Sequence, residues 1–214
     1  MSKFKGLIFD VDGTLTSTNQ LIFDSFNHIT EKYLNRTYTD KEIVAFFGPT
    51  ENVIIMDLMK DNYEEARKDY FEFYRNNHKR LADTYPGIYE LINTLSGKTL
   101  LSVYTGKGRD SMVITLQETG IHDHFDMVVS GDDIEGHKPS PEGINLFLDK
   151  FNLAPEEVLM IGDAPADQIA ARDAGCKVAS VLWDSYAKDN GFWKESDYAF
   201  HSVEELSAFL LDSI

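Results

Sequence analysis

Short apolar stretches alternate with segments of helical spacing along most of the chain, and this alternation leaves few architectures open. The segments of helical spacing repeat apolar residues every three or four positions, as Ile88, Leu91, Ile92 and Leu95 do. Alternating strands and helices indicate an α/β fold, in which a parallel sheet carries helices on both faces. Five stretches, rich in β-branched and aromatic residues, are predicted to be its buried strands: Gly6–Phe9, Thr99–Tyr104, Met127–Val129, Val158–Ile161 and Val178–Leu182.

Charge and composition exclude several classes of protein. The 214 residues include 36 acidic and 20 basic side chains, giving a formal net charge of −16, so we expect neither nucleic acid nor a membrane as a partner. Hydrophobic residues make up 43% of the chain, which is enough for a packed core. The single cysteine, Cys176, rules out an intrachain disulfide framework. Because the first apolar run, Leu7 to Phe9, is too short for a signal peptide and no stretch is as long as a membrane span, we expect a cytoplasmic protein.

Residues 16–83 interrupt the alternation. They hold several helical patterns and no strand pattern. The segment starts with Thr16-Ser-Thr-Asn19, expected to be a hinge and a helix N-cap, and ends with the turn Asp83-Thr-Tyr-Pro-Gly87. We therefore predict a core formed by residues 1–15 and 84–214, and an α-helical insertion of residues 16–83. Two crossings to the core would let this insertion move as a lid.

Polar residues follow each predicted strand. In an open parallel sheet, ligands bind beyond the carboxyl ends of the strands, near the point where the winding direction changes. The predicted site is therefore this rim of the sheet. The segments that reach it are Asp10-Val-Asp12-Gly13-Thr14, Thr105-Gly106-Lys107, Ser130-Gly-Asp-Asp133, His137-Lys138-Pro139, and Gly162-Asp163 with Asp167.

Four carboxylates on this rim point to a metal. Gathered at one place, they would repel one another and shift toward protonation unless a cation were present. Mg²⁺ is a hard divalent ion that prefers oxygen ligands and leaves positions open for water and a phosphate oxygen. The sequence therefore predicts a Mg²⁺ site formed by Asp10, Asp12, Asp163 and Asp167.

The remaining polar groups on the rim suit an anion. Lys138 adds a positive charge, and Thr105 offers a hydroxyl and backbone amides. Together with the metal they describe a site for phosphoryl transfer, in which Asp10 attacks phosphorus to form an aspartyl phosphate. Asp12 can then protonate the leaving group and later deprotonate water. The residues predicted to contact the substrate in the core are Gly13, Thr105, Gly106 and Lys138.

These ordered motifs resemble those of the haloacid dehalogenase-like hydrolase superfamily. The resemblance covers essentially the whole chain and implies a Rossmann-like, doubly wound core with a helical cap inserted between the first and second motifs. The branch it indicates contains phosphoglycolate phosphatases, pyrophosphatases and β-phosphoglucomutases. The residues that carry it are Asp10-Val-Asp-Gly-Thr-Leu15 after an N-terminal strand, Thr105, Lys138-Pro139, and Gly162-Asp163 with Asp167.

Carried to the matching positions, the resemblance implies that Asp10 is the nucleophile and Asp12 the general acid and base. It implies that Thr105 and Lys138 bind phosphate, with Lys138 also orienting Asp10. Mg²⁺ would be held by Asp10, the backbone carbonyl of Asp12 and Asp163, with Asp167 in support. Dehalogenases and phosphonatases of the superfamily lack an acid at the position of Asp12, so its presence favours phosphate esters or anhydrides.

The expected function is Mg²⁺-dependent hydrolysis of a small phosphorylated metabolite. The substrate would be a phosphate monoester, such as phosphoglycolate, or pyrophosphate, and the intermediate an aspartyl phosphate. A phosphomutase like β-phosphoglucomutase would use the same core residues and stays open as an alternative. We expect a monomer or a homodimer.

Two pairs of residues allow two interpretations. Lys107 and Arg109 could reach the phosphate, but as the first residues of a helix they are expected to be solvated. Thr50 and Glu51 follow the turn at Gly48-Pro49, where Thr50 can cap a helix. Alternatively, as the resembling branch implies, the same turn faces the core site and both residues contact the substrate. An aromatic series in the insertion is expected to form the lid's own core: Tyr63, Tyr70, Phe71, Phe73 and Tyr74.

Overall fold

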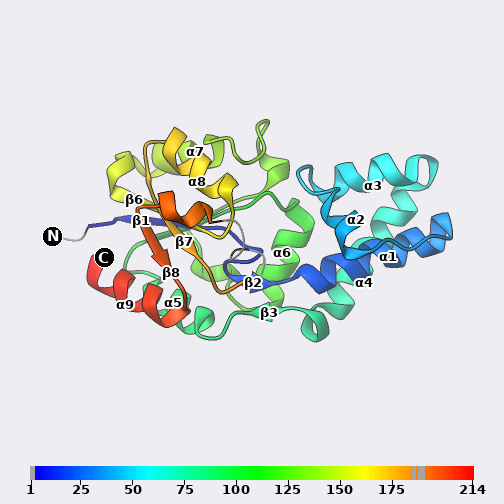
Figure 1. Ribbon diagram of the computed structural model, residues 1–214, viewed down its shortest axis with the longest axis horizontal. Coiled ribbons are helices and arrows are strands. Elements are labelled where there is room, and N and C mark those ends of the chain that lie inside the picture. The colour runs from blue at the N-terminus through cyan, green and yellow to red at the C-terminus, as the bar shows by residue number, and fades with distance from the viewer. Residues whose placement is uncertain (1–2, 185–186, 188–190) are drawn as a thin grey trace.

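The computed structural model describes residues 3–184, 187 and 191–214. Figure 1 shows a larger part built around a sheet and a smaller helical part beside it. Met1 and Ser2, which belong to the predicted core, lie outside the described residues. Over the described ranges, no helix has both the length and the apolar character needed to cross a membrane.

Six strands of the described chain form one parallel sheet at the centre of the larger part. The chain runs outward from β1 to β4 and β5, returns to β6 beside β1, and continues to β7 and β8. The winding direction therefore reverses between β1 and β6, and the predicted α/β fold is confirmed. In spatial order the strands are β5 (Met127–Val129), β4 (Leu100–Tyr104), β1 (Gly6–Phe9), β6 (Val158–Gly162), β7 (Lys177–Val181) and β8 (Tyr198–Phe200).

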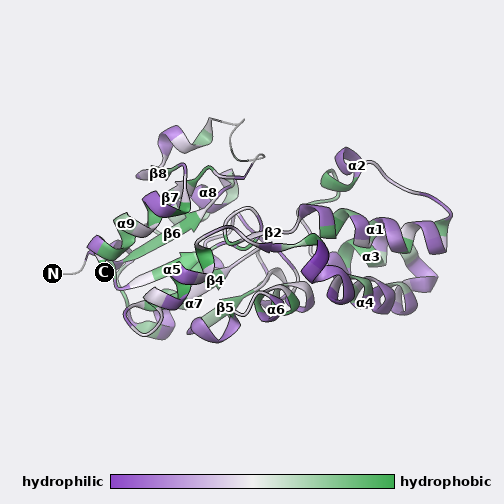
Figure 2. Ribbon diagram, turned by 90° about the horizontal axis from the view of Figure 1, so that it is seen from below, coloured by the Kyte–Doolittle hydropathy of each residue, from purple (hydrophilic) through white to green (hydrophobic). Residues whose placement is uncertain are grey.

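Helices cover both faces of the sheet. Successive side chains of a strand point to opposite faces, so Leu7 and Phe9 join one core cluster and Ile8 joins another. Figure 2 shows this burial in the colouring: β6 is hydrophobic along its length, whereas the helices mix hydrophobic and hydrophilic residues. The helices on the Leu7 face are α5 (Ile88–Leu95), α6 (Arg109–Glu118) and α9 (Val203–Ser213), and those on the Ile8 face are α7 (Glu142–Phe151) and α8 (Pro165–Asp173). Short 3₁₀ segments lie at Lys60–Asn62, His122–His124, Gly131–Asp133, Pro155–Glu157 and Phe192–Glu195.

Some elements differ from the prediction at their ends. Strand β4 begins at Leu100, one residue later than expected, and β7 spans Lys177–Val181, one residue earlier. Strand β8 was not predicted, because its residues Tyr198-Ala199-Phe200 include no β-branched residue, whereas the equally short β5 contains two valines. Helix α8 packs on the sheet through small residues such as Ala170 and Ala171.

The helical part lies between two short strands in sequence. Its apolar faces form a separate core that includes the buried rings of Tyr70 and Tyr74, as expected for the aromatic series. Ile114 of α6 belongs to the same cluster, so α6 is the platform on which the helical part packs. The helices are α1 (Asn19–Leu34), α2 (Asp40–Val44), α3 (Glu51–Met59) and α4 (Tyr63–Leu81).

The chain leaves and re-enters the larger part through a two-stranded connection. Strands β2 (Thr16–Ser17) and β3 (Asp83–Thr84) pair antiparallel there. The expectation of an insertion without strands was wrong at these two ends, because a two-residue strand has no alternating pattern to read. We keep as our proposal that residues 16–83 form a separate cap domain and that residues 1–15 and 84–214 form the core domain.

Candidate active site

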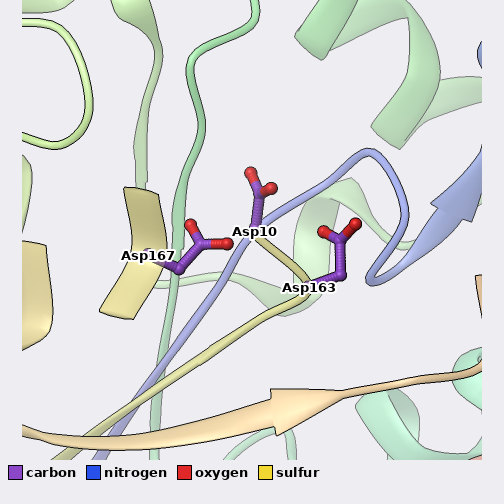
Figure 3. A group of neighbouring side chains, drawn as sticks. All are labelled: Asp10, Asp163 and Asp167. Carbon is purple, nitrogen blue, oxygen red and sulfur yellow. The ribbon is translucent and has the colours of Figure 1, made fainter. Parts of the chain in front are cut away.

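Three carboxylates meet at the carboxyl ends of β1 and β6 (Figure 3). Asp10 follows β1, Asp163 follows β6, and Asp167 lies in the first turn of α8; one oxygen of each lies within 4.8 Å of the others. The loop after β1 passes so close to Asp163 that a Cβ atom placed on Gly13 would lie only 2.2 Å from Asp163 Oδ2. Gly13 also has a φ angle of +81°, so this position requires glycine. The reversal of winding thus brings together acids from two strand ends.

Lys138 lies among these carboxylates. Lys138 Nζ is 3.0 Å from Asp10 Oδ1 and 2.5 Å from Asp167 Oδ1. Burial raises the pKa of Asp10; Lys138 opposes this rise while Asp167 and Asp12 add to it, and the resulting pKa is about 6. Burial, with the neighbouring Asp10 and Asp167, also raises the pKa of Asp163 well above its usual range. Lys138 alone therefore does not offset burial and the repulsion among the three carboxylates.

The cluster suits a divalent metal ion. Three carboxylates form the hard oxygen donor set that such ions prefer, and a cation would relieve their mutual repulsion. Asp10 Oδ1 is buried and accepts no hydrogen bond of suitable geometry, although Lys138 lies close by. Elsewhere in the described chain no group of three or more His, Cys, Asp and Glu side chains meets in the same way. Asp10, Asp163 and Asp167 are therefore the residues that could hold a metal.

The Asp12 side chain lies apart from the cluster. Each of its carboxylate oxygens is 3.2 Å from Lys107 Nζ, and it accepts a hydrogen bond from the Thr18 hydroxyl. The expectation that four carboxylates gather was therefore wrong for this side chain, which turns toward Lys107 and the start of α1. Thr18 occupies the expected N-cap position of α1, but its side chain makes no capping hydrogen bond. Metal binding through the Asp12 backbone carbonyl stays a prediction.

Lys107 is buried, which corrects the expectation that it is solvated. Its side chain is 1% exposed, and its Nζ lies 3.7 Å from Glu51 Oε1 in addition to its contacts with Asp12. Burial disfavours the charge, but the Asp12 and Glu51 carboxylates outweigh this effect, so the pKa of Lys107 is raised. The feature of the sequence that indicated a role for Lys107 in the site was its position on the rim, two residues after Thr105. Arg109 is exposed, as expected.

Thr105 and Gly106 lie where the prediction put them, on the rim after β4. Thr105 is 2% exposed; its backbone N–H donates to the Val129 carbonyl at 3.0 Å, and its hydroxyl accepts from the Lys107 N–H at 3.2 Å. These bonds fix the loop that follows the strand. Thr105 and Gly106 both line the cavity described next.

A cavity of about 260 Å³ lies between the rim of the sheet and the cap. Among the predicted site residues, those that line it are Asp10, Asp12, Glu51, Thr105, Gly106, Lys138 and Asp167. Lys107 lines it as well, whereas Gly13, Thr50 and Asp163 do not. The cavity therefore joins two of the three metal-binding candidates, Asp10 and Asp167, to both lysines and to the inner face of the helical part.

The turn before α3 contacts the core directly. Glu51 accepts hydrogen bonds from the Gly108 N–H at 2.6 Å and from the Ser111 hydroxyl at 2.5 Å, both at the start of α6. Thr50 stands at the N-cap position of α3, but it makes no capping bond and its buried hydroxyl has no partner among the described residues. Thr50 therefore begins α3 and, like Glu51, also faces the core, because its side chain lies beside Gly108 and Gly131. Contact of either residue with the substrate stays a prediction.

Comparison with known proteins agrees with this geometry. Residues 7–181 match the haloacid dehalogenase-like hydrolase family model. Pyrophosphatase PpaX of Bacillus cereus (strain G9842) is 34% identical over 178 residues, which are 83% of this chain and 82% of that protein. A predicted phosphoglycolate phosphatase from Haemophilus somnus 129pt has a TM-score of 0.83 at 22% identity, with 98% of this chain and 99% of that chain covered. A proposed β-phosphoglucomutase from Thermotoga maritima has a TM-score of 0.76 at 26% identity, with 99% and 100% covered. The chain therefore belongs to the haloacid dehalogenase-like hydrolase family.

Proposed function

We propose that this protein is a Mg²⁺-dependent phosphatase that hydrolyses a small phosphorylated metabolite through an aspartyl phosphate on Asp10. The observation that carries the proposal is the position of Asp10, which lines the cavity, lies 3.0 Å from Lys138 and belongs to a cluster of three carboxylates. The substrate is a phosphate monoester or pyrophosphate, the latter named in the curated relative from Bacillus cereus. We keep the expectation of a monomer or homodimer in the cytoplasm.

Asp10 is the proposed nucleophile. One of its carboxylate oxygens attacks phosphorus, a bond forms between them, and the bond from phosphorus to the leaving-group oxygen breaks. Lys138 fixes the orientation of Asp10 and offers positive charge to the phosphoryl oxygens. Mg²⁺, held by Asp10, Asp163 and the Asp12 carbonyl with Asp167 in support, would screen the negative charges of carboxylate and phosphate from each other.

Asp12 is the proposed general acid and base. It gives a proton to the leaving-group oxygen as the ester bond breaks, and then accepts a proton from the water that hydrolyses the aspartyl phosphate. Lys107 and Thr18 both bond to its carboxylate and so position it. Thr18 lies at the start of α1 and Lys107 just before α6, so Asp12 lies where the two parts of the protein meet.

The phosphoryl group is proposed to bind against the loops after β1 and β4. Thr105 offers its hydroxyl and Gly106 its backbone amide, whereas the Gly13 N–H already donates to the Thr16 carbonyl at 2.9 Å. The cap above them excludes bulk water, which strengthens each electrostatic interaction in the site. Glu51 contributes by attaching the cap to α6 through Gly108 and Ser111.

A phosphomutase remains the second candidate because of the structural similarity to the Thermotoga maritima protein. Such an enzyme would return the phosphoryl group to a sugar phosphate and would have to hold a second phosphate. The cap residues that line the cavity include no Lys, Arg or His to bind one. We therefore favour hydrolysis.

Phosphate release from a panel of compounds tests the proposal. The panel contains phosphoglycolate, pyrophosphate, sugar phosphates, nucleotides and an aryl phosphate, each with Mg²⁺ and with EDTA. We expect release that needs Mg²⁺ and that Asp10→Asn abolishes, whereas Asp61→Asn, an exposed aspartate in the cap, leaves it unchanged. Substantial release by Asp10→Asn, or isomerised sugar phosphate in place of free phosphate, would contradict hydrolysis through Asp10.

A further inference from the structure

The cap side of the cavity is mainly apolar. Glu51 is its one charged residue and Asn19 its one neutral polar side chain. None of the described cap residues at the cavity is cationic. The remaining cap residues that line it are Ile22, Phe26, Phe47, Gly48, Pro49 and Ile54.

The two cations at the cavity both come from the core and are already paired. Lys138 Nζ lies 3.0 Å from Asp10 Oδ1 and 2.5 Å from Asp167 Oδ1. Lys107 Nζ lies 3.2 Å from both oxygens of Asp12 and 3.7 Å from Glu51. Neither lysine is free to neutralise a second anionic group of the substrate.

The phosphoryl group occupies the core side of the cavity, beside Asp10, so the leaving group extends toward the cap. An anionic leaving group there would lose its hydration against apolar side chains and gain no counter-ion. It would also approach the Glu51 carboxylate, and like charges brought together at a binding surface repel strongly. A neutral leaving group avoids both costs and can bury apolar atoms against Phe26 and Ile54.

We propose that the substrate is a small phosphate monoester whose leaving group is uncharged and partly apolar. The inference rests on the proposed phosphatase function and narrows it. A cavity of about 260 Å³ lies at the small end of ligand sites, which span about 300–1,000 Å³, so the leaving group is short. The Asn19 amide is the polar group that can hydrogen-bond to it. Pyrophosphate and phosphoglycolate, which each carry a second anionic group, are poor substrates on this account.

Two compounds of nearly identical shape isolate the charge of the leaving group. Phosphoglycolate ends in a carboxylate, and phosphoglycolamide ends in the isosteric neutral amide. With Mg²⁺ present, we expect the kcat/KM of the wild-type enzyme to be at least about tenfold higher for the amide. Calorimetry with the Asp10→Asn variant measures the binding of both compounds without turnover, and there too the amide should bind more tightly.

A matched pair of variants tests whether the cap sets this preference. Phe47 lines the cavity and is 44% exposed, so Phe47→Lys can add a cation there without disturbing the buried core. Val53 is 41% exposed and does not line the cavity, so Val53→Lys adds the same charge to the cap surface. We expect Phe47→Lys to reduce the preference for the amide by about fivefold, as for a partly exposed ion pair, and Val53→Lys to leave it unchanged.

The outcomes separate this inference from the proposed function. An equal or higher kcat/KM for phosphoglycolate would overturn the inference and leave hydrolysis intact. Equal or tighter binding of phosphoglycolate to Asp10→Asn would overturn it as well, with or without turnover. Tighter binding of the amide with no phosphate release from either compound would contradict the proposed hydrolysis and support the inference.

Discussion

Replacing Lys107 with Met tests the charge network behind Asp12. Lys107 Nζ lies 3.2 Å from both Asp12 oxygens and 3.7 Å from Glu51 Oε1, and its side chain is 1% exposed. Methionine is similar in length and has no charge. The substitution therefore removes the cation between two carboxylates and leaves them facing each other at the junction of core and cap.

The distances set the size of the expected effect. At an effective dielectric constant of about 20, unit charges 3.2 Å apart attract by about 5 kcal/mol, and those 3.7 Å apart by about 4.5 kcal/mol. The net loss is smaller, because burying the Lys107 charge itself costs free energy. Removing one partner of a buried ion pair costs about 3–5 kcal/mol. Because the Asp12 side chain is 27% exposed and can regain some hydration, we expect the free energy of unfolding to fall by about 3 kcal/mol.

Urea unfolding followed by circular dichroism measures this loss. Lys98→Met is the matched control, since Lys98 is an exposed lysine of the core, and we expect it to change the free energy of unfolding by less than about 0.5 kcal/mol. The double variant Lys107→Met with Glu51→Gln should recover part of the lost free energy of unfolding, because one of the two carboxylates left without a cation becomes neutral. A loss below about 1 kcal/mol for Lys107→Met, the range of exposed ion pairs, would refute the buried network.

Three further predictions concern the site and its surroundings. Asp12→Asn should lower kcat by about 10²–10⁴-fold with little change in KM, and a rise in KM alone would count against a role in proton transfer. Mg²⁺ at about 100 times its Kd should stabilise the fold by about 2.7 kcal/mol, seen as a higher Tm that Asp163→Asn largely loses; an unchanged wild-type Tm would contradict metal binding there. Burial raises the pKa of Cys176 to about 12, so at about pH 8 a thiol reagent should label Cys176 only after unfolding, and rapid labelling of the native protein would be inconsistent with this environment.

The sheet could be predicted from the sequence because its strands are buried on both faces. Such strands appear as continuous apolar runs, as Leu7-Ile8-Phe9 does, and every one of these residues is 0% exposed. The strands that were missed lack this pattern. Strands β2 and β3 have two residues each, and β8 has no β-branched residue, whereas the equally short β5 has two.

The geometry of the site was only partly predictable. Asp10 and Asp163 come together because each directly follows a strand whose end reaches the same rim, which follows from the topology alone. Lys138 joins them through the longer connection that follows β5. The surroundings of Asp12 depend instead on how the cap packs. Glu51 covers Lys107 only when α3 meets the start of α6, and no local pattern in the sequence reports that contact.

The covalent state of Asp10 during turnover tests the central claim most directly. The enzyme is mixed with Mg²⁺ and an aryl phosphate, quenched in acid within the first turnovers, and digested for peptide mass spectrometry. We predict one phosphoryl group on the peptide that contains Asp10, absent when substrate is omitted and absent from Asp10→Asn. Full-rate release of phosphate with no phosphoryl group on Asp10, or undiminished turnover by Asp10→Asn, would contradict the account.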